Sequence, residues 1–193
     1  MIEAYIKHQE ERAGQGLPPL PLNADQTAQL IKLIQTPLDG QTDLLIELLT
    51  HRVPPGVDEA AELKAAFLTE IATGKSKLAA IDRNKAVFLL GTMLGGYNVM
   101  PLIDLLDDDE VAEAACTALS KTILVYAAFK IVAQKAQSNK WAKKTIDSWA
   151  QADWFTSREP LADKITVTVF KVDGETNTDD LSPASEAWSR PDI

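Results

Sequence analysis

The residues that most often carry catalysis or bind metals are few in this chain and widely spaced. The two histidines, His8 and His51, fall on separate predicted helices, without the His-x-x-His or His-Glu-x-x-His spacing of a local zinc site. Neither lies beside a nucleophile, and no Gly-x-Ser-x-Gly elbow occurs. The single cysteine, Cys116, excludes a disulfide framework and an all-cysteine iron–sulfur site within this chain. Because its surroundings are apolar, we expect Cys116 to be a small buried core residue.

Two other short motifs have simple structural explanations. The run Asp107-Asp108-Asp109 lacks the alternating ligands and the glycine of a calcium loop. It falls between two predicted helices, where acidic side chains favour the positive end of the second helix dipole, so we interpret it as a helix cap. Gly95-Gly96 has no following Gly-Lys-Ser/Thr and is predicted to end a helix, not to bind phosphate.

Residues 114–146 contain lysines but no Asp or Glu, although the whole chain has a formal net charge of -9. An acidic chain is not attracted as a whole to nucleic acid or to anionic membranes, so only a local patch could bind an anionic partner. The alternative is an ordinary solvated helix face. The candidate patch, close in sequence to three tryptophans, consists of Lys130, Lys135, Lys140, Lys143 and Lys144.

Amphipathic helices account for most of the chain, and capping signals mark their ends. Asn23 and Gln26 form a capping-box pattern before a helix that Pro37 closes. Asp82 is predicted to open a later helix, and Gly74 to cap the end of the helix before it. The similar runs LIKLI, LIELL and LIDLL, at 30–34, 45–49 and 102–106, recur at irregular spacing. We interpret them as degenerate HEAT-like stacked helical hairpins, an α-solenoid; an irregular helical bundle is the alternative.

Nothing in the sequence indicates export or membrane insertion. A hydrophobic fraction of 46% over 193 residues suffices for a core. The N-terminus lacks a basic segment followed by an apolar run, and the longest apolar stretch, at 122–133, is much shorter than the ~20 residues of a membrane span. We therefore expect a cytoplasmic protein with no membrane contact.

Near the end of the sequence, the spacing of the apolar residues changes from that of a helix to that of a strand. Residues 165–172 are β-branched and alternate roughly between polar and apolar, which predicts one strand, and Asp173-Gly174 predicts a turn. A single strand is not stable alone, so it must pair within the chain or begin a sheet that continues beyond Ile193.

Three stretches carry a resemblance to a known family: LTHRVPPGVDEA at 49–60, LGTMLGGYN at 90–98, and FKVDGETNTDDLSPA with AWSRPDI at 170–184 and 187–193. Taken together, these stretches make the chain closely similar to the N-terminal part of bacterial aconitate hydratase B enzymes. The resemblance implies a mainly α fold: a HEAT-like helical domain over residues 1–163, then residues 164–193 as a short β segment that begins an incomplete swivel domain.

The resemblance also implies a chemistry for the complete enzyme. Family members are hydro-lyases that interconvert citrate and isocitrate through cis-aconitate on a [4Fe-4S] cluster. The cluster cysteines of the family lie beyond Ile193 and Cys116 matches none of them, so the chain alone is expected to hold no cofactor or metal and to be inactive. Arg190 matches the family's Trp-Ser-Arg-Pro-Asp-Ile arginine, and its planar guanidinium suits a substrate carboxylate.

The remaining expectations concern partners. In this family the helical domain is associated with protein–protein contact, so we expect a homodimer through that domain, contacts with the remaining aconitase domains, and mRNA binding by the cluster-free form. The alternatives are a stand-alone HEAT-like interaction protein and an RNA-binding regulatory module. The preference of the complete enzyme for citrate or 2-methylcitrate stays open.

Overall fold

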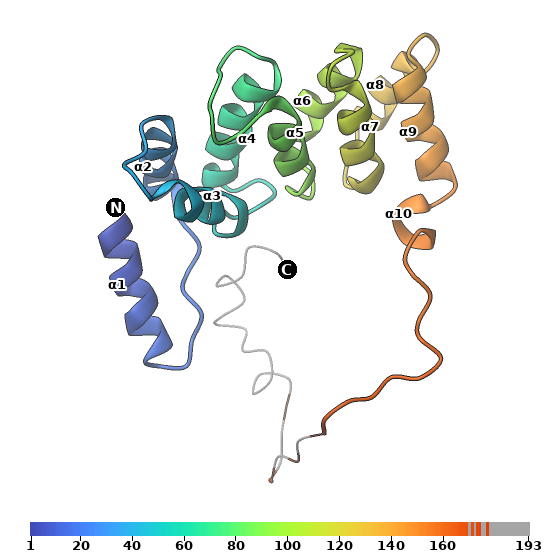
Figure 1. The fold of residues 1–193 in the computed structure, drawn as a ribbon. Coiled ribbons are helices and arrows are strands. Elements are labelled where there is room, and N and C mark those ends of the chain that lie inside the picture. The colour runs from blue at the N-terminus through green and yellow to red at the C-terminus, as the bar shows by residue number, and fades with distance from the viewer. Residues whose placement is uncertain (170, 172, 175–176, 178–193) are drawn as a thin grey trace.

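The structure is a computed structural model, and it describes residues 1–169, 171, 173–174 and 177. Within these residues the chain forms α-helices and one 3-10 helix, and no strand, which confirms the predicted mainly helical class (Figure 1). The elements are α1 (Ile2–Ala13), α2 (Ala24–Gln35), α3 (Thr42–His51), α4 (Glu59–Ala72), α5 (Arg83–Gly91), α6 (Val99–Asp104), η1 (Leu105–Asp107), α7 (Ala112–Lys121), α8 (Ala128–Lys135), α9 (Lys140–Ala150) and α10 (Asp153–Thr156).

Capping side chains begin the helices where the sequence predicts them. Asn23 and Gln26 form both halves of a capping box at the start of α2, with distances of 2.9 and 3.0 Å. The Asp82 carboxylate accepts a hydrogen bond from the backbone nitrogen of Lys85 at 2.7 Å and opens α5. Gly74 follows α4 with a φ of +76°. These three predictions are confirmed.

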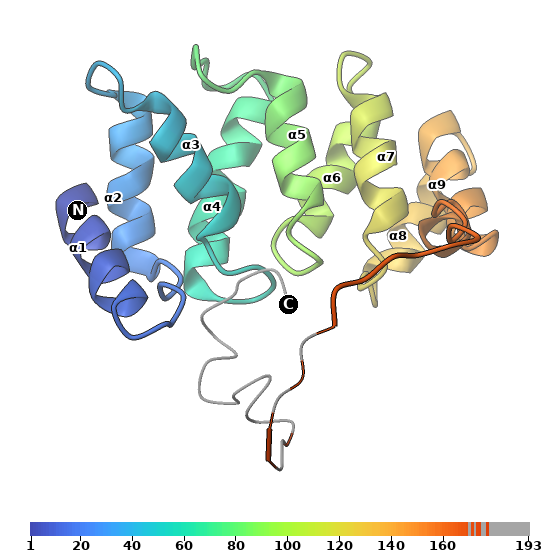
Figure 2. The same ribbon diagram turned by 60° about the horizontal axis from the view of Figure 1, so that its bottom comes forward.

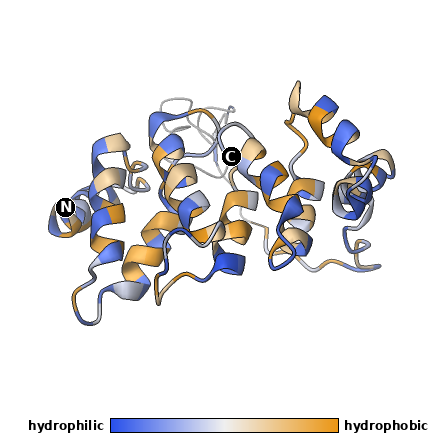
Figure 3. Ribbon diagram, turned by 90° about the horizontal axis from the view of Figure 1, so that it is seen from above, coloured by the Kyte–Doolittle hydropathy of each residue, from blue (hydrophilic) through white to orange (hydrophobic). Residues whose placement is uncertain are grey.

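The helices succeed one another in an elongated row (Figures 1 and 2). Helix α2 packs against α3 and α4, α4 against α5, α5 against α7, and α7 against α9. Apolar residues alternate with polar ones around each helix, as Figure 3 shows, and the apolar ones meet between neighbours. Each fully buried leucine, such as Leu30, Leu68 or Leu119, contributes about 1.5–3 kcal/mol. The assignment to HEAT-like repeats itself stays a prediction.

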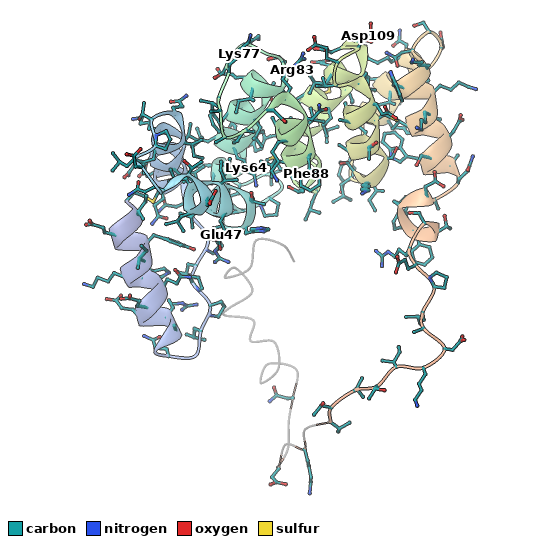
Figure 4. All side chains as sticks on the ribbon, in the orientation of Figure 1. Glu47, Lys64, Lys77, Arg83, Phe88 and Asp109 are labelled. Atoms are coloured by element: carbon teal, nitrogen blue, oxygen red, sulfur yellow. The ribbon has the colours of Figure 1, made fainter. Side chains whose placement is uncertain are left out.

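Ion pairs join neighbouring helices along the upper edge of the row in Figure 4, where Arg83 and Asp109 lie. The Arg83 guanidinium pairs with Asp108 and Glu110, and its Nε donates to the Ala72 carbonyl at 2.8 Å. Helix α7 begins without a side-chain cap. The capping interpretation holds in part for Asp108, whose side chain accepts a hydrogen bond from the Glu110 backbone nitrogen at 3.1 Å in the turn that leads into α7. Asp107 and Asp108 also pair with Lys135 and Arg83 of other helices, which lie within reach at the same edge.

The helical part ends at Thr156, and the described residues after it are mostly exposed. Residues 165–169, predicted as part of a strand, have no strand structure and no backbone hydrogen bond to another described residue. The physical reason is that a strand needs a neighbour to pair with its backbone, and no described segment supplies one. The predicted boundary at 163/164 stays a prediction. None of the described helices has the length and hydrophobicity that a membrane span requires.

Candidate functional site

The five lysines predicted to bind an anionic partner lie on two helices that pack against each other. Arg190 lies outside the described residues. Lys130 and Lys135 lie on α8, and Lys140, Lys143 and Lys144 on α9. The ammonium groups of Lys140 and Lys144 lie 4.8 and 5.5 Å from the centre of the Trp141 ring, close enough for cation–π attraction.

Lys135 serves a structural role in the helical row. Its ammonium pairs with Asp107, and the Asn139 amide donates to the second oxygen of the same carboxylate at 2.9 Å. The hydrogen bond from Lys135 lowers the pKa of Asp107, and the hydrogen bond from Asn139 lowers it further. Burial raises this pKa, but by less than the Lys135 hydrogen bond lowers it. Lys135 is thus already neutralised, and the predicted patch retains Lys130, Lys140, Lys143 and Lys144.

Among the side chains suited to catalysis or metal binding, His8 and Cys116 make hydrogen bonds within the fold, and His51 is exposed. Nε2 of His8 accepts a hydrogen bond from the Leu20 nitrogen at 3.0 Å, and His51 is the exposed last residue of α3. Cys116 is buried, as predicted, and the Thr145 hydroxyl donates to its sulfur at 3.4 Å. No three His, Cys, Asp or Glu side chains of the described residues gather into a metal site. With one thiol, this part of the chain does not fit a [4Fe-4S] cluster, which takes several cysteine ligands.

The loops on one side of the row contact one another in order, and we call them the loop edge: residues 17–22, 52–57, 92–97 and 122–127 (Figure 2). The backbone nitrogen of Leu22 donates to the Arg52 carbonyl at 2.7 Å, and that of Gly56 donates to the Met93 carbonyl at 3.2 Å. The two helical stretches that carry the family resemblance, 49–60 and 90–98, therefore meet here.

Two glycines allow the loops to approach this closely. Gly96 has a φ of +84°, and a Cβ at this position would lie 2.5 Å from the Gly56 carbonyl oxygen. Gly95 has a φ of +125°, and a Cβ there would lie 2.9 Å from the Leu124 carbonyl oxygen. Only glycine combines a positive φ with backbone contact of this kind. Helix α5 ends at Gly91, before the two glycines predicted to end it, and Gly95 and Gly96 instead hold three loops together.

The loop edge exposes large apolar side chains. Val57 is 79% exposed and Tyr126 82% exposed, and Tyr97 and Leu20 are also exposed. Exposed apolar residues are common singly, but a line of them on loops held in fixed positions is typical of a protein–protein interface. Sequence reasoning missed this surface because its members come from four separate loops.

A groove lies at the C-terminal end of the loop edge, between α7, α9 and α10. Its volume is about 710 Å³. Leu94, Ile123, Leu124 and Trp154 contribute apolar surface, and Lys121, Lys144 and Arg158 are its basic residues, against a single acid, Asp153. The lysine-rich stretch predicted Lys144 as part of a cationic surface. Arg158 was missed because no local pattern links it to α7.

Comparison with known proteins gives consistent matches over the whole chain. Residues 4–155 match a family model described as Aconitate B N-terminal domain, and residues 167–193 match one described as Aconitate hydratase 2 N-terminus. The chain is 57% identical over 194 residues to Aconitate hydratase B of Salmonella typhimurium and 56% identical over 194 residues to that of Escherichia coli. It is 48% identical over 195 residues to Aconitate hydratase B of Helicobacter pylori. Each match covers 100% of this chain but only 22–23% of the relative.

Proposed function

Because the chain belongs to the aconitate hydratase B family, matching its N-terminal domain over residues 4–155, we propose that it is the non-catalytic assembly domain of a hydro-lyase. The complete enzyme would interconvert citrate and isocitrate, with the [4Fe-4S] cluster held by residues beyond this chain. In this proposal Arg190, inside the second matched region, binds a substrate carboxylate. The cell compartment of the complete enzyme is the cytoplasm.

The observation that carries the proposal is the loop edge. Backbone hydrogen bonds join the first three loops, and the fourth lies against Gly95. The four loops present exposed apolar side chains, whereas the described residues contain no group of metal ligands. Burying Val57 and Tyr126 against another domain would remove apolar surface from water at about 25 cal/mol per Å². The partner surface is the remainder of the enzyme, since the relatives are several times longer than this chain.

Substitutions on the loop edge test this proposal in the complete enzyme. Val57→Asp with Tyr126→Asp places two charges at the interface, and calorimetry should then show the helical domain unfolding as a separate transition. Neither change should disturb the domain itself, because both positions are exposed and Asp tolerates the positive φ of Tyr126. Leu38→Asp, in the loop between α2 and α3 and 65% exposed, is the matched control. A double variant that unfolds like the control would refute the assembly role.

Two further partners belong to this proposal. We propose that the helical domain also forms a homodimer, which light scattering on this chain tests directly: a monomer mass at all concentrations would contradict it. A second candidate function, binding of mRNA, is favoured by the exposed Lys130, Lys140, Lys143 and Lys144. It is tested by RNA affinity after Lys140, Lys143 and Lys144 become Ala: a loss of affinity supports this role, and unchanged affinity excludes the patch.

A further inference from the structure

The first loop of the loop edge, residues 17–22, runs back alongside α1 (Figure 1), and we call it the proline connector. Its sequence, Leu-Pro-Pro-Leu-Pro-Leu, contains three prolines, which have no backbone N–H. The nitrogens of its three leucines donate, in chain order, to the Arg12 carbonyl, to Nε2 of His8 and to the Arg52 carbonyl, at 3.0, 3.0 and 2.7 Å. Each backbone donor of the connector thus has an acceptor. Of the three acceptors, only the imidazole of His8 takes up a proton near neutral pH.

Leu20, in the middle of the proline connector, is bound to α1 through both its nitrogen and its carbonyl. The nitrogen donates to His8, and the carbonyl accepts from the Tyr5 hydroxyl at 3.4 Å. The rings of Tyr5 and His8 lie one helical turn apart on α1, with their centres separated by 6.1 Å. Nε of Arg52, which follows α3, donates to the same Tyr5 hydroxyl at 2.8 Å. Because both neighbours of Leu20 are prolines, its bond to His8 is the single link from a backbone donor over residues 18–21.

Helix α1 is held on the row by its first apolar residues and by the proline connector. Tyr5 is buried, and Met1 and Ile2 pack partly buried against the core. Nε of Arg12 donates to the Pro18 carbonyl at 2.9 Å. An isolated helix of 12 residues is only marginally stable in water. We therefore expect α1 to lose helical structure when the connector separates from it.

We propose that proton binding by His8 releases the proline connector and α1, so that acid loosens the first loop of the loop edge. A neutral imidazole has a lone pair at Nε2 for the Leu20 N–H, whereas an imidazolium carries a proton on each nitrogen and has no acceptor. Two N–H groups then face each other, and the Leu20 donor loses its partner. Histidine side chains change charge between about pH 5 and pH 8, a range in which Asp, Glu, Lys and Arg ordinarily do not.

Neighbouring charges favour the released connector once His8 is protonated. Arg12 and Arg52 both donate to carbonyls of the connector, so an imidazolium is a third cation at the same segment. Glu11, one turn from His8, attracts an imidazolium, but it pairs with Lys7 at 3.7 Å and is 61% exposed, where such attraction is weak. The connector has no titratable side chain. The titratable or charged side chains on this face of α1 and at the end of α3 are Tyr5, Glu11, Arg12, His51 and Arg52.

Hydrogen exchange followed by NMR tests the proposal on this chain at about pH 7 and about pH 5.5. Protection factors are compared, because they remove the intrinsic pH dependence of exchange. We expect the factors of the Leu20 amide and of amides 6–13 to fall about tenfold at the lower pH, and those of α7 to stay unchanged. Equal protection of α1 at both pH values, or an equal fall in α1 and α7, would overturn the proposal.

Two substitutions assign the effect, since the chain contains two histidines. His8→Gln supplies an amide oxygen that accepts a hydrogen bond at both pH values, so α1 should keep its protection at the lower pH. His51→Gln is the matched control at the exposed last residue of α3, and the tenfold fall should persist in it. A fall that persists in His8→Gln, or that disappears in His51→Gln, would show that His8 is not the responsible group.

A third variant keeps the test decisive if the glutamine does not hold the connector at about pH 7. His8→Ala removes the acceptor at every pH, so α1 should show the low protection of the acid form at both pH values. Full protection of α1 in His8→Ala at about pH 7 would contradict the proposal, because the Leu20 bond would then contribute nothing to the attachment of the helix.

The consequence for docking rests on the proposed function, whereas the release of α1 does not. If α1 loses protection in acid but the loop-edge variants leave the complete enzyme unfolding like its control, the proposed function is wrong and the release by His8 stands. If the loop-edge variants uncouple the domain but the protection of α1 is independent of pH, only the role of His8 is wrong.

Discussion

At the scale of single residues, Gly96 fixes the geometry of the loop edge. Gly96→Ala requires alanine at a φ of +84° and places Cβ 2.5 Å from the Gly56 carbonyl oxygen, so the loops must separate. We expect a loss of about 3 kcal/mol in the free energy of unfolding, measured by urea titration. Gly16→Ala, at a φ of +74° with nothing near its Cβ, should lose only about 1 kcal/mol. Equal losses would mean that the loop contact contributes nothing.

Lys64 gives the chain a pH dependence that its sequence did not reveal. The side chain, labelled in Figure 4, extends from α4 and is buried, and its ammonium donates to the Thr50 carbonyl at 3.3 Å. Burial lowers the pKa of Lys64 from 10.5 to about 8. Between about pH 8 and pH 10.5, Lys64 carries a proton in the unfolded chain but not in the folded protein. The contribution of Lys64 to the free energy of unfolding therefore rises with pH.

Lys64→Met removes this titration and keeps most of the side-chain volume. The free energy of unfolding of the unmodified chain relative to Lys64→Met should therefore increase by about 3 kcal/mol between pH 7 and pH 10.5. Urea titrations of both proteins at several pH values measure it. A constant difference over this range would show that Lys64 keeps its ordinary pKa in the folded protein.

At the scale of elements, Asn139 joins α9 to the preceding helices. Its side-chain oxygen accepts from the backbone nitrogens of Trp141 and Ala142, at 2.8 and 2.9 Å, and caps α9, while its amide donates to the Leu106 carbonyl at 2.8 Å. Asn139→Ala should cost about 2 kcal/mol of stability, and hydrogen exchange should show α9 opening first. Asn23→Ala removes a cap without such a cross-link and should cost about 1 kcal/mol. Asn139→Ala costing no more than this control would contradict the cross-link.

Helix positions and caps were predictable because their causes are local. Asn23 with Gln26 and Asp82 satisfy backbone groups within three residues, and the inward face of α5 follows from its apolar spacing. The role of Asp107 was not predictable, because its partner Lys135 lies 28 residues away. The strand prediction shows the same limit at residues 165–169, since strand formation depends on a neighbour that local alternation does not reveal; residues 170 and 172 of that prediction lie outside the described residues.

At the scale of the whole molecule, the fold brings both candidate surfaces to places that no single motif marks. The loop edge collects residues from four loops, and the groove between α7, α9 and α10 collects residues from Leu94 to Arg158. The lysine-rich stretch was predictable from the sequence. The sequence did not reveal that Lys135 pairs with Asp107, whereas Lys144 lines the groove. Arg190, predicted from the family resemblance, lies outside the described residues and stays a prediction.

Hydrogen exchange on the complete enzyme and on this chain tests the assembly role most directly. If the loop edge docks the remainder of the enzyme, amides in residues 56–57, 94–97 and 123–127 should exchange at least about tenfold more slowly in the complete enzyme. Amides of residues 36–41, in the loop between α2 and α3, should exchange equally in both proteins. Equal exchange rates on the loop edge in the two proteins would contradict the proposal.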